Sequence, residues 1–343
     1  MDKITLTPLA KVNSKQSVIG ISLLVKLIES YAIDASTMLE KAGINQNVLV
    51  DPKASISFQQ EIAFTTALVN TIKDKDLGFK VGQCYRLNAF GHIGLAAGSC
   101  NTVVDAIELF LKYIRLAYTH FTINFFKKEG NAILRYCDQY ALGELRRFYL
   151  ERDFSFSFLS TRDMFPRSIV GQKPKVIHFD FACPTTVEHY ERLYECPVRF
   201  SMSHNQILFD ERYLDLALPL ANPLTKELLE EQCKQQEIAL FGSKNLANKI
   251  RQIIQEMEDE IPKLENIAQM HFITARTLRR KLKEQGVTFQ QIANEELCNK
   301  AFNYLSTTDL SIEQISLRLG YSESASFIHA FKRWTGKTPK QYR

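Results

Sequence analysis

The chain has 343 residues, more than a single hydrophobic core usually holds, so we expect two domains. With 45% hydrophobic and 24% charged residues, its composition is that of a folded globular protein and excludes disordered and collagen-like classes. No apolar run approaches the roughly 18 residues that a membrane span requires, and no secretory signal is visible. We therefore expect a cytoplasmic protein without a membrane partner.

The formal net charge of +5 is unevenly distributed. Residues 241–343 contain 16 Lys or Arg against 11 Asp or Glu, whereas residues 1–240 contain 27 of each kind. Positive charge concentrated in one domain is typical of a module that binds a polyanion, although a merely basic solvated surface gives the same count. The seven cysteines form no C-x-x-C pair, which favours reduced thiols over disulfides or a zinc site.

Residues 1–235 alternate helix and strand signals, which predicts an α+β domain. Apolar residues at three- and four-residue spacing predict helices over residues 18–31, 58–72, 103–117 and 143–165. Alternating apolar residues predict a hairpin of residues 121–126 and 132–136, a strand at 176–181, and a second hairpin of residues 198–200 and 206–209. A Pro-rich stretch after Tyr213 and a polar helix through Gln236 predict the connection to a second domain.

From Leu246 onward strand signals cease, and about seven short helices predict an all-α domain over residues 241–343. An imperfect repeat, in which a short apolar helix, a turn and a longer helix follow one another, predicts two helix-turn-helix units at about residues 262–285 and 311–335. A connecting helix is expected at residues 289–305. The candidate capping residues are Thr274, the Ser311 and Gln314 pair, Gly286 and Gly336.

The longer helix of each unit has separate apolar and polar faces. In the first unit Leu278 and Leu282 share one face, and the candidate DNA contacts lie on the other: Arg276, Arg279, Arg280 and Lys283. Long cationic side chains can bond to guanine edges or to phosphates in the major groove, and the alternative is a charged face that is only solvated.

In the second unit Phe327 and Phe331 mark the packing side of the helix. The candidates on its exposed side are Ser324, Ala325, Ile328, His329, Lys332 and Arg333. A rigid connecting helix would hold the two reading helices about 34 Å apart, so that one chain enters two successive major grooves of double-stranded DNA.

Several segments resemble the AraC/XylS-type DNA-binding domain: Arg276-Thr-Leu-Arg-Arg-Lys-Leu282, residues 286–289 and 315–322, and Ala330-Phe-Lys-Arg-Trp-Thr-Gly-Lys-Thr-Pro-Lys-Gln-Tyr-Arg343. Others resemble the arabinose-binding-type N-terminal domain of the ornithine-regulator branch of that family: Phe90-Gly-His-Ile-Gly94, residues 184–190, Leu193-Tyr-Glu-Cys-Pro-Val-Arg-Phe200 and residues 208–220.

This resemblance implies a cytoplasmic activator or repressor that senses a small organic effector, often forms a homodimer and acts with RNA polymerase. Two positions depart from the family pattern, because His329 and Leu297 stand where such domains usually carry Arg. Both departures predict weaker contacts by the second unit, and His329 would make its contact sensitive to pH.

No G-x-S-x-G, H-E-x-x-H or paired acidic motif is present, so we expect no catalysis, no metal and no cofactor. Gly91, Gly94 and Gly98 lack the context of a phosphate loop and favour close packing. Candidates for an effector pocket, each of which would equally suit the core, are Phe90, His92, Tyr118, His120 and Phe154. Amino acids, fatty acids and other metabolites all fit this composition.

The sequence thus predicts a sequence-specific transcription factor that responds to a small organic effector. The less basic face of the second reading helix leaves a second hypothesis, a sequence-tolerant or architectural DNA-binding protein. Competition by random DNA separates these two. A third hypothesis, an enzyme with a regulatory tail, has no support from particular residues.

Overall fold

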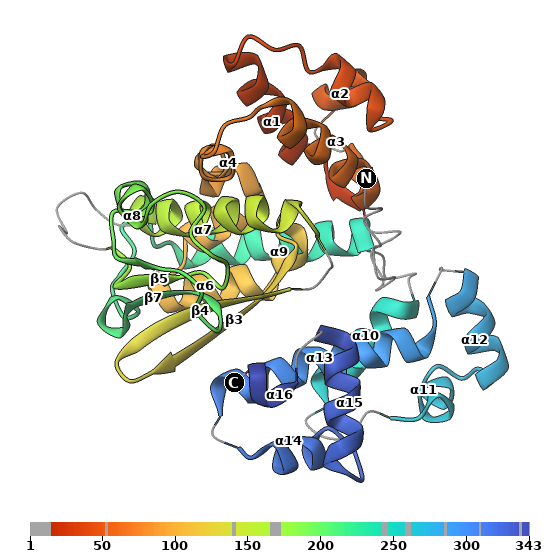
Figure 1. Cartoon of the computed structure of the whole chain (residues 1–343). Coiled ribbons are helices and arrows are strands. Elements are labelled where there is room, and N and C mark those ends of the chain that lie inside the picture. The colour runs from red at the N-terminus through yellow and green to blue at the C-terminus, as the bar shows by residue number, and fades with distance from the viewer. Residues whose placement is uncertain are drawn as a thin grey trace.

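A computed structural model describes residues 15–51, 54–138, 142–164, 173–241, 246–257, 262–284, 287–308, 310–335 and 338–342 of the chain. Figure 1 shows an N-terminal α+β part, in red to green, followed by an all-helical part in blue. This arrangement confirms the predicted fold class. None of the helices in the described ranges is long and apolar enough to cross a membrane.

The chain starts with a group of helices at the top of Figure 1. They are α1 (Ile19–Ser30), α2 (Ser36–Lys41), α3 (Phe58–Thr71) and α4 (Leu77–Cys84), and β1 (Lys15–Ser17) pairs with β2 (Ser55–Ser57) beside them. Ser57 and Gln60 form a capping box that fixes the start of α3. The sequence analysis predicted α1 and α3 but not the short elements α2, α4, β1 and β2.

A five-stranded sheet in the order β3-β4-β7-β5-β6 forms the centre of the N-terminal part. Its strands are β3 (Phe121–Lys128), β4 (Asn131–Asp138), β5 (Val176–His178), β6 (Val198–Arg199) and β7 (Asn205–Asp210). The β3–β4 hairpin confirms the first predicted hairpin. The second predicted hairpin is wrong, because β7 pairs with β4 and β5, while β6 pairs in parallel with β5. Because β7 lies between β4 and β5, its backbone groups form hydrogen bonds on both sides, and Ile207 and Phe209 are buried.

Helices cover one face of this sheet. They are α6 (Val103–Lys112) and α7 (Leu145–Met164), with α8 (Val187–Tyr194) at the edge. Helix α5 (His92–Gly98) packs on α6, and α9 (Pro223–Phe241) packs on α5. Close packing of α4 on α7 depends on Gly82, since a Cβ there would lie 2.3 Å from the Arg152 carbonyl oxygen. Gly94 is closely packed, as the sequence analysis expected, because a Cβ there would lie 1.7 Å from the Leu87 carbonyl oxygen.

The described part of residues 246–342 contains seven helices and no strand. They are α10 (Leu246–Glu256), α11 (Leu264–Met270), α12 (Ala275–Glu284), α13 (Phe289–Thr307), α14 (Ile312–Arg318), α15 (Ser324–Thr335) and α16 (Pro339–Tyr342). Two separate hydrophobic clusters hold them together, and α13 contributes Ile292 to the first and Ala301, Phe302 and Leu305 to the second. The connecting helix is therefore part of both cores.

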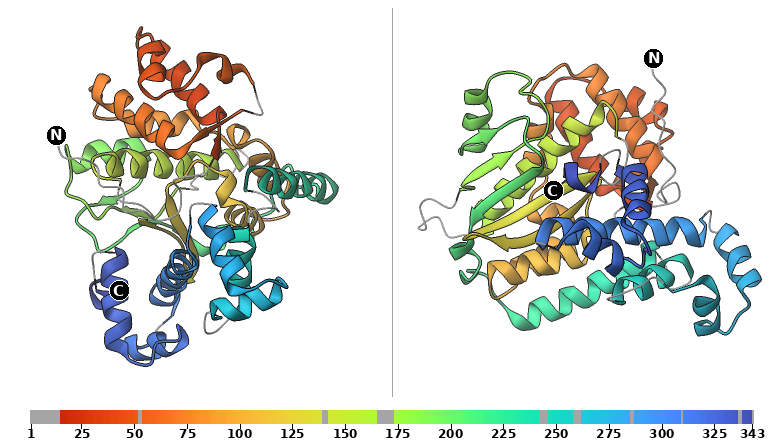
Figure 2. Two further views of the ribbon diagram at one scale, coloured as in Figure 1. Left: turned by 90° about the vertical axis from the view of Figure 1, so that its right-hand side faces the viewer. Right: turned by 60° about the horizontal axis from the view of Figure 1, so that its bottom comes forward.

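The second face of the sheet meets these C-terminal helices. Side chains alternate along β4, so that Leu134 and Tyr136 point toward α6 and α7 while Cys137 joins the hydrophobic cluster of α13 and α15. Figure 2 shows the blue helices beside the yellow β3–β4 hairpin from two further directions. One strand thus separates the interior of the N-terminal part from the helical part.

Candidate nucleic-acid interface and effector cavity

The first helix-turn-helix unit consists of α11, a turn and α12. The Thr274 hydroxyl accepts a hydrogen bond of 3.2 Å from the Thr277 amide, which confirms Thr274 as the N-cap. Leu278 and Leu282 are fully buried and fix the inner face of α12. Phe272 in the turn has φ 52° and is 97% exposed.

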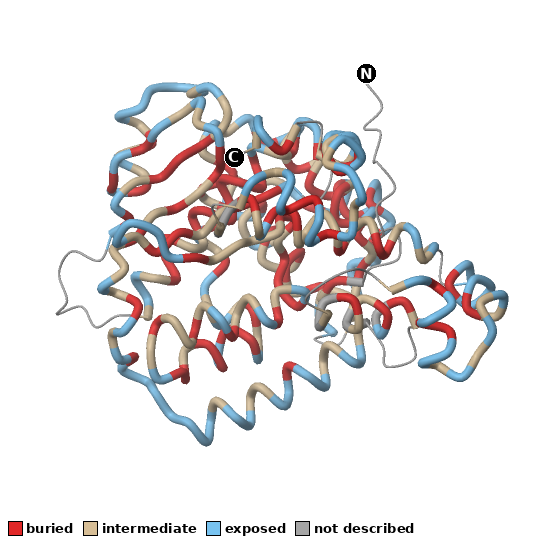
Figure 3. Tube along the Cα trace, turned by 90° about the horizontal axis from the view of Figure 1, so that it is seen from below, coloured by how far each residue is buried: buried red, intermediate tan, exposed pale blue. Residues whose placement is uncertain are grey.

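The four cationic candidates of this unit, Arg276, Arg279, Arg280 and Lys283, are all exposed. Arg279 lies 3.4 Å from Glu265 and Arg280 lies 2.5 Å from Glu284, both pairs being open to water. Because exposed pairs contribute little free energy, these cations can exchange their partners for phosphates at low cost. The region of α11 and α12, at the right edge of Figure 3, is largely exposed.

The second unit repeats the arrangement with α14 and α15. Ser311 and Gln314 form the predicted capping box, and Gly320 lies in the turn between α14 and α15 with φ 79°. Phe327 and Phe331 are fully buried on the inner side of α15. Of the predicted contact residues, Ala325, His329, Lys332 and Arg333 are exposed, whereas Ser324 and Ile328 are half-buried. The proposed C-caps Gly286 and Gly336 lie outside the described residues.

A hollow of about 620 Å³ lies between the two units. Lys263 at the start of α11, His329 and Arg333 on α15, and Asn294 on α13 line it, and its described lining contains no acidic side chain. Leu297 also lines the hollow and adds an apolar group to it. The sequence analysis missed Lys263 and Asn294, because they belong to different helices and are brought together only by the fold.

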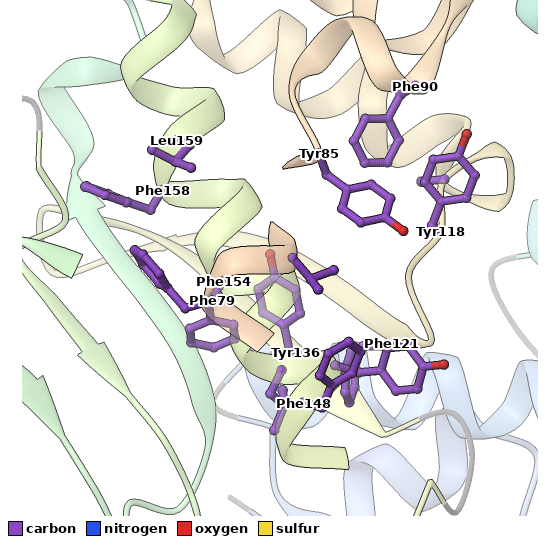
Figure 4. Packing of buried hydrophobic residues seen from close by; sticks show 14 of the residues in the cluster. Phe79, Tyr85, Phe90, Tyr118, Phe121, Tyr136, Phe148, Phe154, Phe158 and Leu159 are labelled. Carbon is purple, nitrogen blue, oxygen red and sulfur yellow. The ribbon is translucent and has the colours of Figure 1, made fainter. Parts of the chain in front are cut away.

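The N-terminal part contains a partly open cavity of about 100 Å³ between the sheet, α6 and α7. Two of the sequence candidates, Phe90 and Tyr118, line it, and Figure 4 shows these two rings beside Tyr85. Apolar side chains from three other elements complete the wall: Ala106, Ile107 and Phe110 of α6, Ile123, Phe125, Ala132 and Leu134 of the hairpin, and Phe156 and Met164 of α7.

The structure does not place the other three pocket candidates at this cavity. His92 is exposed and lies 3.3 Å from the Gln236 side chain. His120 is buried with its Nε2 atom 2.9 Å from Glu61, and Phe154 is buried against Tyr136 and Phe179. Each side chain satisfies a local packing or hydrogen-bonding need, which sequence patterns do not distinguish from lining a pocket.

Three charged side chains border the cavity, and each has a partner. Arg152 donates hydrogen bonds of 2.7 Å to Asp153 and to the Tyr118 carbonyl oxygen. The second oxygen of Asp153 accepts a 2.6 Å hydrogen bond from Thr119. Asp210 lies 3.0 Å from Arg212 and 3.3 Å from Lys175. The charges at the cavity are therefore balanced within the protein.

Two helix-turn-helix units on a shared helix, joined to an α+β domain with an internal cavity, define a DNA-binding regulator of transcription. A model of the arabinose-binding domain of AraC transcription regulators matches residues 33–218, and a helix-turn-helix domain model matches residues 267–343. The first match covers more than half of the chain, so the chain belongs to the AraC family. This family is one of transcriptional regulators and not an enzyme class.

The chain is also similar to individual known regulators. The chain is 27% identical over 322 residues to the ornithine utilization regulator of Pseudomonas aeruginosa, with 93% of this chain and 94% of the relative covered. It is 26% identical over 325 residues to a helix-turn-helix-type regulator of Mycobacterium tuberculosis, covering 93% and 94%. The crystal structure of the regulator CdpR from P. aeruginosa is 21% identical, covers 90% of this chain and 96% of that chain, and has a TM-score of 0.42.

Proposed function

We propose that the protein is a sequence-specific transcription factor whose residues 241–343 read DNA and whose residues 1–235 respond to a small organic effector. The main support is α12, where four exposed cations stand opposite a face anchored by buried Leu278 and Leu282. A helix with this division packs on one side and offers hydrogen-bond donors to a major groove on the other.

The second unit extends the site along the DNA. Because α13 is part of the cores of both units, the units are held at a fixed separation, as entry into two successive major grooves requires. The DNA backbone between those grooves would cross the hollow, where Lys263 and Arg333 offer positive charge. We propose that the protein acts in the cytoplasm with RNA polymerase and as a homodimer.

Binding of the full-length protein to the DNA upstream of its own gene tests this proposal. We expect tight binding that random DNA competes for only at about 10³-fold excess or more. The double variant Arg276→Ala/Arg280→Ala should lose this binding, while Lys26→Ala on the exposed side of α1 should retain it. Absence of a footprint at physiological salt would refute the proposal.

A sequence-tolerant DNA-binding protein is the second candidate function. It is favoured by α15, whose exposed face carries Ala325 and His329 among its cations. In that case random DNA would compete as well as the upstream DNA, and the measured affinity would depend on salt alone.

A further inference from the structure

The cavity in the N-terminal part offers apolar walls but no free charge. Its rings pack closely on one another, with 4.4 Å between the centroids of Phe90 and Phe156 and 5.4 Å between those of Phe90 and Phe110. Burial raises the pKa of Tyr118 to about 12, so this phenol stays neutral. A ligand that binds here leaves water and contacts hydrocarbon and aromatic side chains.

An amino-acid zwitterion does not suit such a site. Its carboxylate would need a free cation, but Arg152 already bonds to Asp153 and the Tyr118 carbonyl oxygen. Its ammonium group would need a free anion, but Asp153 and Asp210 already have partners. Charges buried without such partners lose much more hydration energy than the cavity returns.

One polar atom at the cavity still lacks a partner. The Ser160 side chain on α7 lines the cavity and is 4% exposed, and its hydroxyl has no hydrogen-bond partner among the described residues. The neighbouring hydroxyl groups do have partners: the Ser157 hydroxyl lies 2.5 Å from the Tyr136 hydroxyl, and the Thr161 hydroxyl donates to the Ser157 carbonyl oxygen at 2.8 Å. A buried hydroxyl without a partner requires an explanation, and a bound ligand supplies one.

We infer that the effector is an uncharged apolar molecule with one hydroxyl or carbonyl group, which bonds to Ser160 while the rest lies among the aromatic side chains. This inference rests on the proposed effector response. The volume of about 100 Å³ sets the scale, since an engineered cavity of about 150 Å³ in another protein binds benzene. The present cavity is smaller, so side chains of its wall must shift to admit a one-ring ligand of about six to eight heavy atoms.

Thermal unfolding of the full-length protein with benzyl alcohol, toluene and L-ornithine tests the inference, because a ligand of the folded state raises the melting temperature with its concentration. We expect benzyl alcohol to raise it more than toluene does, and L-ornithine to have no effect. Ser160→Ala should weaken benzyl alcohol binding about 2- to 10-fold and remove its advantage over toluene. Ala106→Leu, which fills the cavity, should abolish both effects, with Ala132→Val as the second variant if Ala106→Leu does not fold.

Stabilisation by L-ornithine but not by benzyl alcohol would overturn the inference. So would stabilisation by benzyl alcohol that persists in the cavity-filling variant, because the ligand would then bind elsewhere. DNA binding measured on the same preparation separates the two proposals. Binding of upstream DNA without a response to benzyl alcohol refutes only the ligand class, whereas loss of specific DNA binding refutes the proposed function.

Discussion

The thiol of Cys137 lies 2.6 Å from the phenol oxygen of Tyr342, which joins strand β4 of the N-terminal sheet to helix α16 of the DNA-binding part. The Tyr342 ring also packs on His204 of the N-terminal part and on Phe302 of α13, with centroids 5.2 Å and 4.8 Å apart. Tyr136, the residue before Cys137, points to the opposite side and lines the cavity. Tyr342 therefore contacts a strand whose other side lines the cavity.

Removal of the Tyr342 ring should make Cys137 reactive. Burial raises the pKa of the Cys137 thiol to about 11, so little reactive thiolate is present at neutral pH. In Tyr342→Ala the thiol becomes hydrated, and we expect its alkylation by iodoacetamide to accelerate at least about tenfold, since rate follows the thiolate fraction. Mass spectrometry of the labelled peptides measures this rate. Cys100, buried within the N-terminal part, is the internal control, and equal labelling of both thiols would indicate global unfolding instead.

Arg280→Ala should weaken binding to the specific DNA site by about 1 to 3 kcal/mol if this side chain reads a base. Specificity should then relax at one position of the site, as selection of binding sequences from a randomised pool would reveal. The Glu284 partner of Arg280 is exposed and is left in water, so protein stability should not change. An equal loss on all sequences would identify Arg280 as a phosphate contact, and unchanged affinity would exclude it from the interface.

His329→Arg should strengthen DNA binding by the second unit. His329 is exposed at the hollow between the units, and arginine there adds a permanent charge near the expected path of the DNA backbone. We expect tighter binding and a salt dependence steeper by about one unit of log–log slope. Titrations at several salt concentrations measure it, and the matched control is Gln59→Arg, which adds the same charge at an exposed position of α3. An unchanged slope of affinity against salt concentration would show that residue 329 of α15 lies away from the DNA phosphates.

Local signals explain why the helix-turn-helix units were predictable from sequence. The spacing of Leu278 and Leu282 and the capping box of Ser311 and Gln314 act within a few residues, and both appear in the structure as predicted. The position of β7 between β4 and β5 was not predictable, because it depends on pairing across long stretches of chain. Residues that line the cavity could not be separated from core residues for a similar reason, since Phe154 in the core and Phe90 at the cavity have the same sequence pattern.

Gly82→Ala should destabilise the N-terminal part by about 1 to 3 kcal/mol, because the new Cβ would lie 2.3 Å from the Arg152 carbonyl oxygen and backbone must move. Gly98→Ala at the end of α5 is the matched control. Its Cβ would meet nothing within 4 Å, so the variant should be equally stable or gain about 0.5 to 1 kcal/mol. Urea unfolding of both variants measures the difference, and equal stabilities would contradict the close packing of α4 on α7.

Glu151→Gln should remove a pH dependence of stability. Burial raises the pKa of Glu151 from 4.5 to about 7, against the opposing effect of the 2.5 Å hydrogen bond that Tyr190 donates. Between these values the folded chain holds a proton that the unfolded chain releases, so this carboxyl group lowers the free energy of unfolding as pH rises from about 4.5 to 7. Glutamine accepts the same hydrogen bond without titrating. We therefore expect similar urea stabilities near about pH 4 and a more stable variant near about pH 7.5, and a difference independent of pH would show that burial does not shift the pKa of Glu151 in the folded chain.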